Sequence, residues 1–335
     1  MKNKLKTVRE VRHLSASGEH IHEDHAHDGV DRRGFLKCMA WAGTGVLWTV
    51  SGGVLGSKIL SGSAAAAERS PTMGDFNFVQ ISDSHIGFNK PANTDVVGTL
   101  KQAIAKVNLL PTAPDFILHT GDLTHLSDPS EFDTLDQLMK STKAGHVFYV
   151  PGEHDVISDN GKEFRARYGK GSKGNGWFSF DQRGVHFIGL VNVMNIAEGA
   201  LGMLGEEQLA WLKDDVSALS SSTPIVVFAH VPLWSIYPQW GWGTQDAERA
   251  LGMLKRFGSV TVLNGHIHQT LKKVEGNVTF HTATSTAFPQ PAPGKAPKPG
   301  PMKVAPEILP TVLGITEVSY VENAHTLAVV DAKLG

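Results

Sequence analysis

The sequence has almost no cysteine and almost no excess of charge of either sign. Its one cysteine, Cys38, excludes an internal disulfide framework and a zinc site built from thiolates. The 31 lysines and arginines nearly balance the 33 aspartates and glutamates, so we expect no binding of a nucleic-acid polymer through bulk positive charge. With 41% hydrophobic residues, the chain is too apolar to stay unfolded throughout. Histidine is the abundant reactive residue, present 16 times.

The 335 residues fit one large α/β domain or two smaller domains. Residues 1–67 have the organisation of an export signal with a long polar N-terminal region. Arg32-Arg33 precedes a mildly apolar stretch over residues 38–60, and a run of small residues ends at Ala67. A basic segment, an apolar segment and an Ala-x-Ala site in this order are typical of a cleavable signal. The arginine pair, followed by Phe35-Leu36-Lys37, resembles the twin-arginine signal, whose translocase exports folded proteins in bacteria.

We therefore expect cleavage near Ala67 and a periplasmic or secreted protein without a stable membrane span. The alternative is an uncleaved signal that anchors the protein in the membrane, because the apolar stretch is long enough to cross a bilayer. Its many glycines and Lys58 make it a weakly apolar span, so cleavage is the preferred interpretation.

Short apolar runs alternate with amphipathic periods from Phe76 onward, which is typical of an α/β domain. This domain is predicted over residues 68–335. The expected strands are Phe76–Ser82, Phe116–His119, Val147–Val150, Val185–Val191, Ile225–Ala229 and Val260–Leu263. The expected helices are Thr94–Val107, Pro129–Met139 with Ser127 or Asp128 as its cap, Glu206–Leu219 and Asp246–Phe257.

Three turns indicate hairpins, so part of the sheet structure is expected to be antiparallel. They lie at 181–184, at 275–277 and between the apolar runs 314–321 and 325–331. Residues 289–310 are rich in proline, glycine and lysine and are predicted to form a loop.

Acidic residues and histidines follow five of the expected strands. The carboxyl ends of the strands form the ligand site of an open α/β sheet. Taken singly, each residue could be a capping aspartate or a buried structural histidine, but five strands that all end in this way indicate one shared site. The residues are Asp83, His85, Asp122, Glu153, His154, Asp155, His230, His266 and His268.

This donor set favours Mn, Fe or Zn, because it consists of carboxylates and imidazoles without thiolates. Seven candidate ligands exceed the needs of one ion, and a shared carboxylate would hold two divalent ions about 3.5–4 Å apart. Such a pair suits an in-line displacement at phosphorus. Glycines beside the ligands, such as Gly121, Gly152 and Gly265, would allow tight turns and close approach of a substrate.

As a set, these motifs resemble the five blocks of the calcineurin-like metallophosphoesterases. The blocks are Asp83-x-His85, Gly121-Asp122, Gly152-Glu153-His154-Asp155, His230 and Gly265-His266-x-His268, and the resemblance spans residues 76–285. It implies a four-layer α/β/β/α sandwich of two mixed β-sheets flanked by helices, with a dinuclear metal centre. Gly121-Asp122-Leu123-Thr124 looks most similar to the cyclic-nucleotide phosphodiesterase branch.

The resemblance also implies a role for each residue. Asp83, His85, Asp122 and His268 would hold the first metal, and Asp122, Glu153, His230 and His266 the second. His154 would protonate or polarise the leaving oxygen, while a hydroxide bridging the metals would be the nucleophile. Asp155 would orient the His154 imidazole, or it would cap a turn.

Glu153 departs from the family, which usually has asparagine at this position. A glutamate can still coordinate the second metal, but it adds a negative charge that faces an anionic phosphate. It could also turn away from the site. We expect coordination, since the residue is held between Gly152 and His154 at the end of a strand.

The expected function is that of an exported phosphodiesterase acting on a nucleotide or another small organic phosphate. A phosphomonoesterase and a non-catalytic metal-binding or sensor module on the same fold are the alternatives.

Residues 234–243 carry four aromatic side chains and no charge, and we expect a loop beside the metals. Its aromatics would stack a base, pack an acyl chain or fill a gap between the sheets. The oligomeric state is left open.

Overall fold

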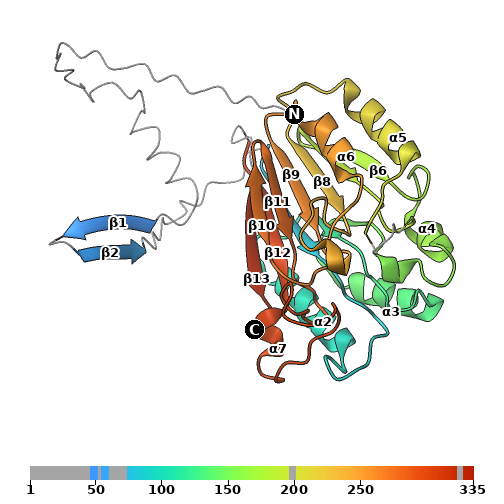
Figure 1. Ribbon diagram of the computed structural model, residues 1–335. Helices are drawn as coiled ribbons and strands as arrows, with labels where there is room; N and C mark the ends of the chain where they lie inside the picture. The colour runs from blue at the N-terminus through green and yellow to red at the C-terminus, as the bar shows by residue number, and fades with distance from the viewer. Residues whose placement is uncertain (1–45, 52–53, 60–73, 196–200, 323–326) are drawn as a thin grey trace, which may run out of the picture. The chain divides into compact units, whose positions relative to one another are not determined.

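The computed structural model describes residues 46–51, 54–59, 74–195, 201–322 and 327–335 (Figure 1). The chain divides into two units, residues 1–69 and 70–335, and each is described by itself. In the first unit, β1 (Val46–Ser51) pairs antiparallel with β2 (Val54–Ile59). Most of the predicted export signal lies outside the described residues, and it stays a prediction. None of the helices in the described ranges is both long enough and apolar enough to cross a bilayer.

Two mixed β-sheets form the centre of the second unit. One has the strand order β13-β12-β3-β4-β5, and the other has the order β10-β11-β9-β8-β7-β6. The first contains β3 (Phe76–Ile81), β4 (Phe116–His119), β5 (Val147–Tyr149), β12 (Gly314–Tyr320) and β13 (Leu327–Lys333). The second contains β6 (Phe178–Gln182), β7 (Val185–Gly189), β8 (Ile225–Ala229), β9 (Val260–Asn264), β10 (Lys272–Glu275) and β11 (Val278–Thr282). The three predicted hairpins are the antiparallel pairs β6–β7, β10–β11 and β12–β13.

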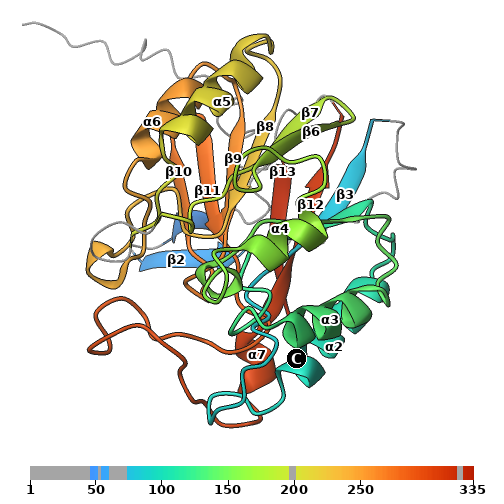
Figure 2. The ribbon, with the colours of Figure 1, turned by 90° about the vertical axis from the view of Figure 1, so that its right-hand side faces the viewer.

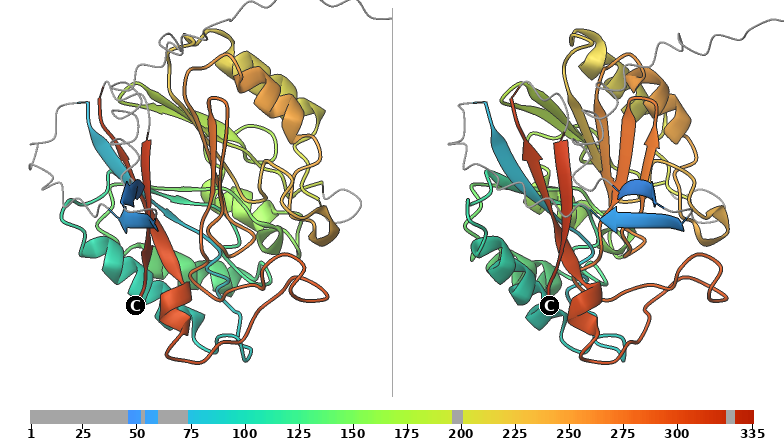
Figure 3. Two further views of the ribbon diagram at one scale, coloured as in Figure 1. Left: turned by 60° about the vertical axis from the view of Figure 1, so that its left-hand side comes forward. Right: turned by 90° about the vertical axis from the view of Figure 1, so that its left-hand side faces the viewer.

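The helices cover the outer faces of the two sheets (Figure 2; Figure 3). On one side, α2 (Val96–Asn108) and α3 (Pro129–Met139) pack on the five-stranded sheet through residues such as Leu100 and Phe132. On the other side, α5 (Glu206–Ser217) and α6 (Ala247–Leu254) pack on the six-stranded sheet through residues such as Leu212. A third apolar core, with Phe78, Phe116 and Phe187, fills the space between the sheets. The predicted four-layer α/β/β/α sandwich is confirmed.

Local sequence explains where the predicted helices begin. Asp128 is the N-cap of α3: its carboxylate accepts a hydrogen bond from Ser130 N at 2.8 Å, Glu131 completes a capping box, and Pro129 occupies the first turn. Asp95 caps α2 in the same way, accepting from Gly98 N at 2.8 Å, so this helix begins two residues later than predicted. The short helices α4 (Lys162–Tyr168) and α7 (Leu309–Val312) were not predicted, and α7 begins inside the expected loop 289–310.

The register of the strands brings their carboxyl ends to one edge. Ile81 pairs with His119, which pairs with Tyr149, and these are the last residues of β3, β4 and β5. In the other sheet, Ala229 at the end of β8 pairs with Asn264 at the end of β9. The segments that leave each sheet therefore start at equal heights, which is the condition for a site shared by several strands.

Asp331 on β13 connects the two sheets. Its Oδ1 accepts hydrogen bonds from His281 on β11 and from the Thr316 hydroxyl on β12, both at 2.9 Å. Burial alone would raise the pKa of the Asp331 carboxyl, but the hydrogen bond from His281 and the nearby positive charges lower it to about 2. An aspartate with a lowered folded pKa stabilises the protein above its ordinary pKa of 3.8, and the contribution is lost as the pH falls towards 2.

We expect Asp331→Asn to lower the free energy of unfolding at pH 7 by about 1.5–3 kcal/mol, the usual range for hydrogen bonds to a charged group. The difference from the unmodified protein should shrink between pH 4 and pH 2, where Asp331 itself becomes protonated. Urea unfolding at several pH values measures it, with Glu207→Gln on the exposed face of α5 as the control. A loss of stability that did not change with pH would contradict the charged role of Asp331.

Candidate metal centre

All nine predicted site residues lie at the common edge formed by the strand ends. Asp83 and His85 follow β3, and Asp122 follows β4. The short 3-10 helix η1 (Glu153–Asp155) follows β5 and carries the next three. His230 follows β8, and His266 and His268 follow β9. Both sheets therefore contribute to the site.

The backbone is strained at most of these positions. Eight non-glycine residues in the described part of the chain have positive φ, and five of them are Asp83, His85, Asp122, His266 and His268. Their φ values lie between 42° and 70°, a conformation that costs a non-glycine residue free energy. Such strain persists only where the surrounding structure holds it, and it is common at functional sites.

One set of side chains consists of Asp83, His85 and His268. The Nε2 atoms of His85 and His268 lie 3.2 Å apart, and Asp83 Oδ1 lies 3.2 Å from His268 Nε2. All three residues are buried. Their ligand atoms lie within 4.8 Å of one another, so the three can share one ion.

A second set consists of Glu153, His230 and His266. Glu153 Oε2 lies 2.9 Å from His230 Nε2, and Glu153 Oε1 lies 2.9 Å from His266 Nδ1. The carboxylate of Glu153 thus points into the site and lies between two imidazoles. These three residues also present ligand atoms within 4.8 Å of one another.

Asp122 lies between the two sets. Its Oδ2 is 3.4 Å from His85 Nε2 and 3.4 Å from His230 Nε2, while its Oδ1 accepts a hydrogen bond from the backbone N of His154 at 2.9 Å. Because Oδ2 lies at the same distance from one imidazole of each set, it has the position required of a ligand that bridges two ions.

Backbone carbonyls orient two of the imidazoles. His230 Nδ1 lies 2.7 Å from the Thr120 carbonyl, and His268 Nδ1 lies 2.5 Å from the Phe288 carbonyl. A proton on Nδ1 leaves Nε2 free to bind a cation, which is the usual arrangement of a metal-binding histidine.

The electrostatics of the site favour a positive charge between the carboxylates. Burial lowers the pKa of His85 well below its usual value, and the neighbouring His154 and His268 lower it further, so His85 is neutral. Burial also opposes protonation of His230, yet the carboxylates of Asp122 and Glu153 raise its pKa well above the ordinary value. A divalent cation held here would supply the positive charge that these carboxylates attract.

The donor atoms fit metal ions. Glu153 Oε2, His230 Nε2 and His266 Nδ1 are buried, and apart from the 2.9 Å contacts of Glu153 with the two imidazoles they have no polar partner within the described residues. Buried polar atoms that lack good hydrogen bonds are costly, and a metal ion would satisfy all three. The two sets with Asp122 between them can hold two ions.

The glycines next to the ligands make room for other ligands. A Cβ at Gly121, where φ is +95°, would collide with the imidazole of His230. A Cβ at Gly265 would collide with Ser82 and Asp83. The close approach predicted from these glycines is therefore between the strand ends themselves.

The hydrogen bonds of the Asp155 carboxylate go to the loop backbone and to Thr124, and not to the His154 imidazole. Its buried carboxylate accepts hydrogen bonds from the backbone N atoms of Leu123, Thr124 and Gly152 at 2.8–3.0 Å, and from the Thr124 hydroxyl at 2.8 Å. Burial and the nearby Asp122 carboxylate raise the pKa of Asp155 to about 7, although the backbone donors lower it. Of its two predicted roles, the hydrogen bonds support the capping one, because they join the loops after β4 and β5.

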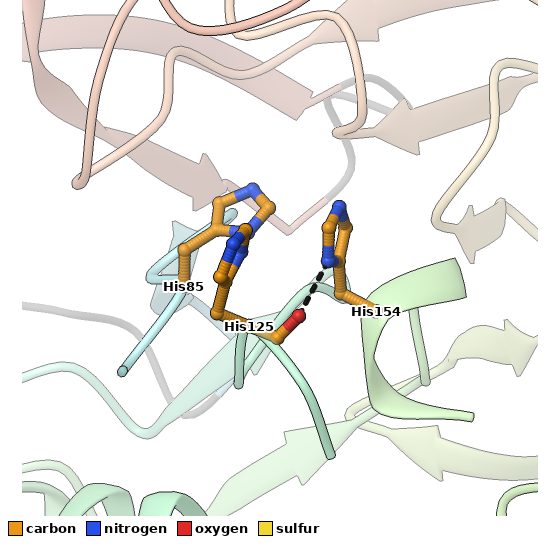
Figure 4. Close-up of side chains that lie close together, drawn as sticks. All are labelled: His85, His125 and His154. Atoms are coloured by element: carbon orange, nitrogen blue, oxygen red, sulfur yellow. Dashed lines mark hydrogen bonds between the residues drawn. The ribbon is translucent and has the colours of Figure 1, made fainter. Parts of the chain in front are cut away.

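His125 takes the place beside His154 instead (Figure 4). Its carbonyl oxygen lies 2.6 Å from His154 Nδ1, and the two imidazoles stack with ring centroids 4.8 Å apart. His85 meets the His154 ring edge-on at 4.8 Å. The spacing of His125 from Asp122 in the sequence does not distinguish this position from a surface histidine.

A cavity of about 380 Å³ opens on the two sets. His154, His125 and Glu153 line it together with Phe88 and Phe288. Residues of the loop 234–243 and of the proline-rich segment also reach it: Trp240, Trp242, Gln290, Pro299, Gly300 and Pro301. Sequence reasoning missed Phe288 and Gln290, because nothing in their local pattern separates them from other loop residues.

The tryptophans of the aromatic loop lie in two different surroundings, and whether the loop binds a base or an acyl chain stays a prediction. Trp234 packs against Phe280 with ring centroids 5.0 Å apart and fills space beside the six-stranded sheet. Trp240 and Trp242 line the cavity, within an apolar cluster that also contains Ile267. One part of the loop is therefore core, and another part lies next to the candidate metal ligands.

Comparisons with known proteins agree with this geometry. Residues 76–270 match the family model of the calcineurin-like phosphoesterases. A 3′,5′-cyclic-nucleotide phosphodiesterase from Nostoc sp. is 24% identical over 63% of this chain and 79% of the relative. A probable glycerophosphodiester phosphodiesterase from Arcobacter nitrofigilis is 26% identical over 62% of this chain and 77% of the relative. A dimetal phosphatase from Danio rerio shares the fold, with a TM-score of 0.57 and 14% identity over 78% of this chain and 96% of that protein.

We expect Glu153→Asn to weaken the binding of a cation by the set of Glu153, His230 and His266. Because the variant loses a negative charge that lies 2.9 Å from both histidines, the dissociation constant for Mn²⁺ should rise about tenfold or more. Titration against a chelator, followed by metal analysis, measures this loss. Glu275→Asn, in the exposed β10–β11 hairpin, is the control. Unchanged retention of both ions would show that Glu153 is not a ligand.

Proposed function

Because the chain belongs to the calcineurin-like phosphoesterase family, we propose that it is a metal-dependent phosphodiesterase acting on a nucleotide or another small organic phosphate. The observation that carries the proposal is the position of Asp122 Oδ2, 3.4 Å from an imidazole of each donor set, at the edge of a cavity that His154 also lines. Two divalent ions, when bound, would activate water and stabilise the charge that develops on the phosphoryl oxygens.

The protein's own residues provide the rest of the chemistry. Asp83, His85 and His268 would hold one ion, Glu153, His230 and His266 the other, and Asp122 both. His154 is held at Nδ1 by the His125 carbonyl, so its Nε2 is the atom available to give a proton to the leaving oxygen. Burial opposes protonation of His154, but the carboxylates of Asp122 and Glu153 raise its pKa, which favours the proton-donating form.

A diester is favoured over a monoester by the charge of the cavity. Lys90 is the one lysine or arginine among the described residues that line it. A monoester dianion needs more positive charge than a diester monoanion does. The aromatic loop and the proline-rich segment both line the cavity and offer an uncharged surface to a second ester group. The names of the Nostoc and Arcobacter relatives support the same choice.

We further propose export by the twin-arginine route. The support lies in the sequence of residues 1–67, in which Arg32-Arg33 precedes an apolar stretch and small residues end at Ala67. The mature protein would lack Cys38 and would meet its substrate outside the cytoplasm. The substrate would then be a phosphate ester that is present there.

Hydrolysis of bis(4-nitrophenyl) phosphate and of 4-nitrophenyl phosphate by the Mn²⁺-loaded protein tests the proposed function. We expect turnover of the diester with kcat/KM clearly above that of the monoester, and loss of turnover after metal removal. A preference for the monoester would correct the substrate class. No turnover of either compound by protein that retains two ions would favour the alternative of a metal-binding or sensor module.

We expect His154→Ala to leave both ions bound and to lower kcat by about 10²–10⁴-fold, the usual cost of a lost general acid. The loss should be smaller for esters with a good leaving group, because these need less protonation. His146→Ala, at an exposed histidine outside this cavity, is the matched control. Loss of metal from His154→Ala would instead make this residue a ligand.

A further inference from the structure

Two loops contribute to the cavity wall, and the residues through which they reach it belong to neither donor set. One carries Trp240 and Trp242, which are 9% and 1% exposed. The other is the segment Pro289–Met302, which reaches the cavity through Pro299, Gly300 and Pro301. The two loops lie next to each other in the views of Figures 2 and 3, and Ala296 of the second packs on the cluster around the two tryptophans.

The second loop is tied to a metal-binding residue. Gln290 Nε2 donates a hydrogen bond to the His266 carbonyl at 2.9 Å, and its Oε1 accepts one from Gly300 N at 3.0 Å. Met302 N donates to the Pro289 carbonyl at 2.8 Å, which closes the base of the loop. The wall therefore has a fixed position relative to the phosphate site, as a specificity element must.

The residues of these loops that line the cavity are tryptophans, prolines, a glycine and Gln290, and none of them is charged. Both carboxylates that line the cavity, Asp122 and Glu153, belong to the donor sets. Tryptophan and proline surfaces bind flat, apolar groups by stacking and by excluding water. A quaternary ammonium also binds to aromatic rings, but Lys90 at the same cavity would repel it.

Building on the proposed function, we propose that the cavity takes diesters whose non-leaving ester group is flat and uncharged, such as a nucleoside or an aryl group. This group packs against the exposed edge of Trp240, which Trp242 supports from behind, and against the Pro299–Pro301 edge. Water adds to phosphorus, the P–O bond to the leaving group breaks, and the proton passes to the leaving oxygen. The flat group stays on the phosphate throughout. Its contacts are the same before and during the reaction, so they lower KM more than they raise kcat.

Three diesters that all release 4-nitrophenol test the proposal: thymidine 5′-(4-nitrophenyl phosphate), 4-nitrophenyl phosphorylcholine and ethyl 4-nitrophenyl phosphate. The leaving group is constant, so differences in kcat/KM report the non-leaving group alone. We expect the thymidine ester to exceed the ethyl ester about tenfold, mainly through a lower KM, as stacking of one base on an aromatic side chain predicts. The choline ester should not exceed the ethyl ester.

Trp240→Leu should remove most of this preference, measured within the variant as the ratio of the kcat/KM values of the thymidine and ethyl esters. Trp234→Leu, in the same loop but packed on Phe280 away from the cavity, should keep it. Calorimetric titration gives a readout without turnover. Thymidine 5′-monophosphate should bind the metal-loaded protein about tenfold more tightly than ethyl phosphate, and the difference should disappear in Trp240→Leu.

Equal kcat/KM for the three esters, or the highest value for the choline ester, would overturn the inference and leave the proposed phosphodiesterase intact. No turnover of any ester would overturn the proposed function and this inference with it. The three esters on the unmodified protein decide the question even if Trp240→Leu does not fold.

Discussion

The position of the Asp122 carboxylate is the constraint on which the rest of the site depends. Its Oδ2 lies 3.4 Å from His85, which follows a strand of one sheet, and 3.4 Å from His230, which follows a strand of the other. The imidazoles of His85 and His230 can both approach Asp122 Oδ2 only if the strands of the two sheets end at the same height and the distance between the sheets is fixed. The phenylalanine-rich core between them, with Phe78 and Phe187, sets that separation. A change in this core would therefore alter the distance between the two donor sets.

The surrounding structure stabilises two features of the site that cost free energy, namely left-handed backbone conformations and buried carboxyl groups. Five residues of the candidate metal centre have positive φ, and Asp83, Asp122 and Asp155 are buried carboxyl groups. Neither feature is stable by itself, since left-handed backbone and buried charge both cost free energy. Asp155 offsets part of the cost, because its carboxylate receives the backbone N–H groups of the loops after β4 and β5. The packed helices on both outer faces supply the remaining stability through buried apolar area.

The sequence predicts best what depends on short-range pattern. Buried strands such as Phe116–His119 and Ile225–Ala229 show as apolar runs, and the residues that follow them reach one edge because parallel strands end together. The helix α4 has only seven residues, too few for a clear period. The hydrogen bonds of Asp155 and the link from Gln290 to His266 join loops far apart in the chain, so no local signal reveals them. The same holds for the different surroundings of Trp234 and Trp240.

The negative charge of Glu153 would affect both the binding of a cation and the charge of the substrate that the site prefers. A neutral amide at this position would leave the second set with no carboxylate besides Asp122, whereas Glu153 adds a full negative charge between His230 and His266. That charge would strengthen the hold on a cation and would repel a phosphate. The repulsion is greater for a monoester dianion than for a diester monoanion, because the Coulomb energy scales with the product of the charges. Lys90 is the one lysine or arginine among the described cavity-lining residues that could offset it. The same carboxylate that retains the metal would thus disfavour the more highly charged substrate, and the uncharged aromatic wall would supply the affinity that a diester loses by carrying less charge.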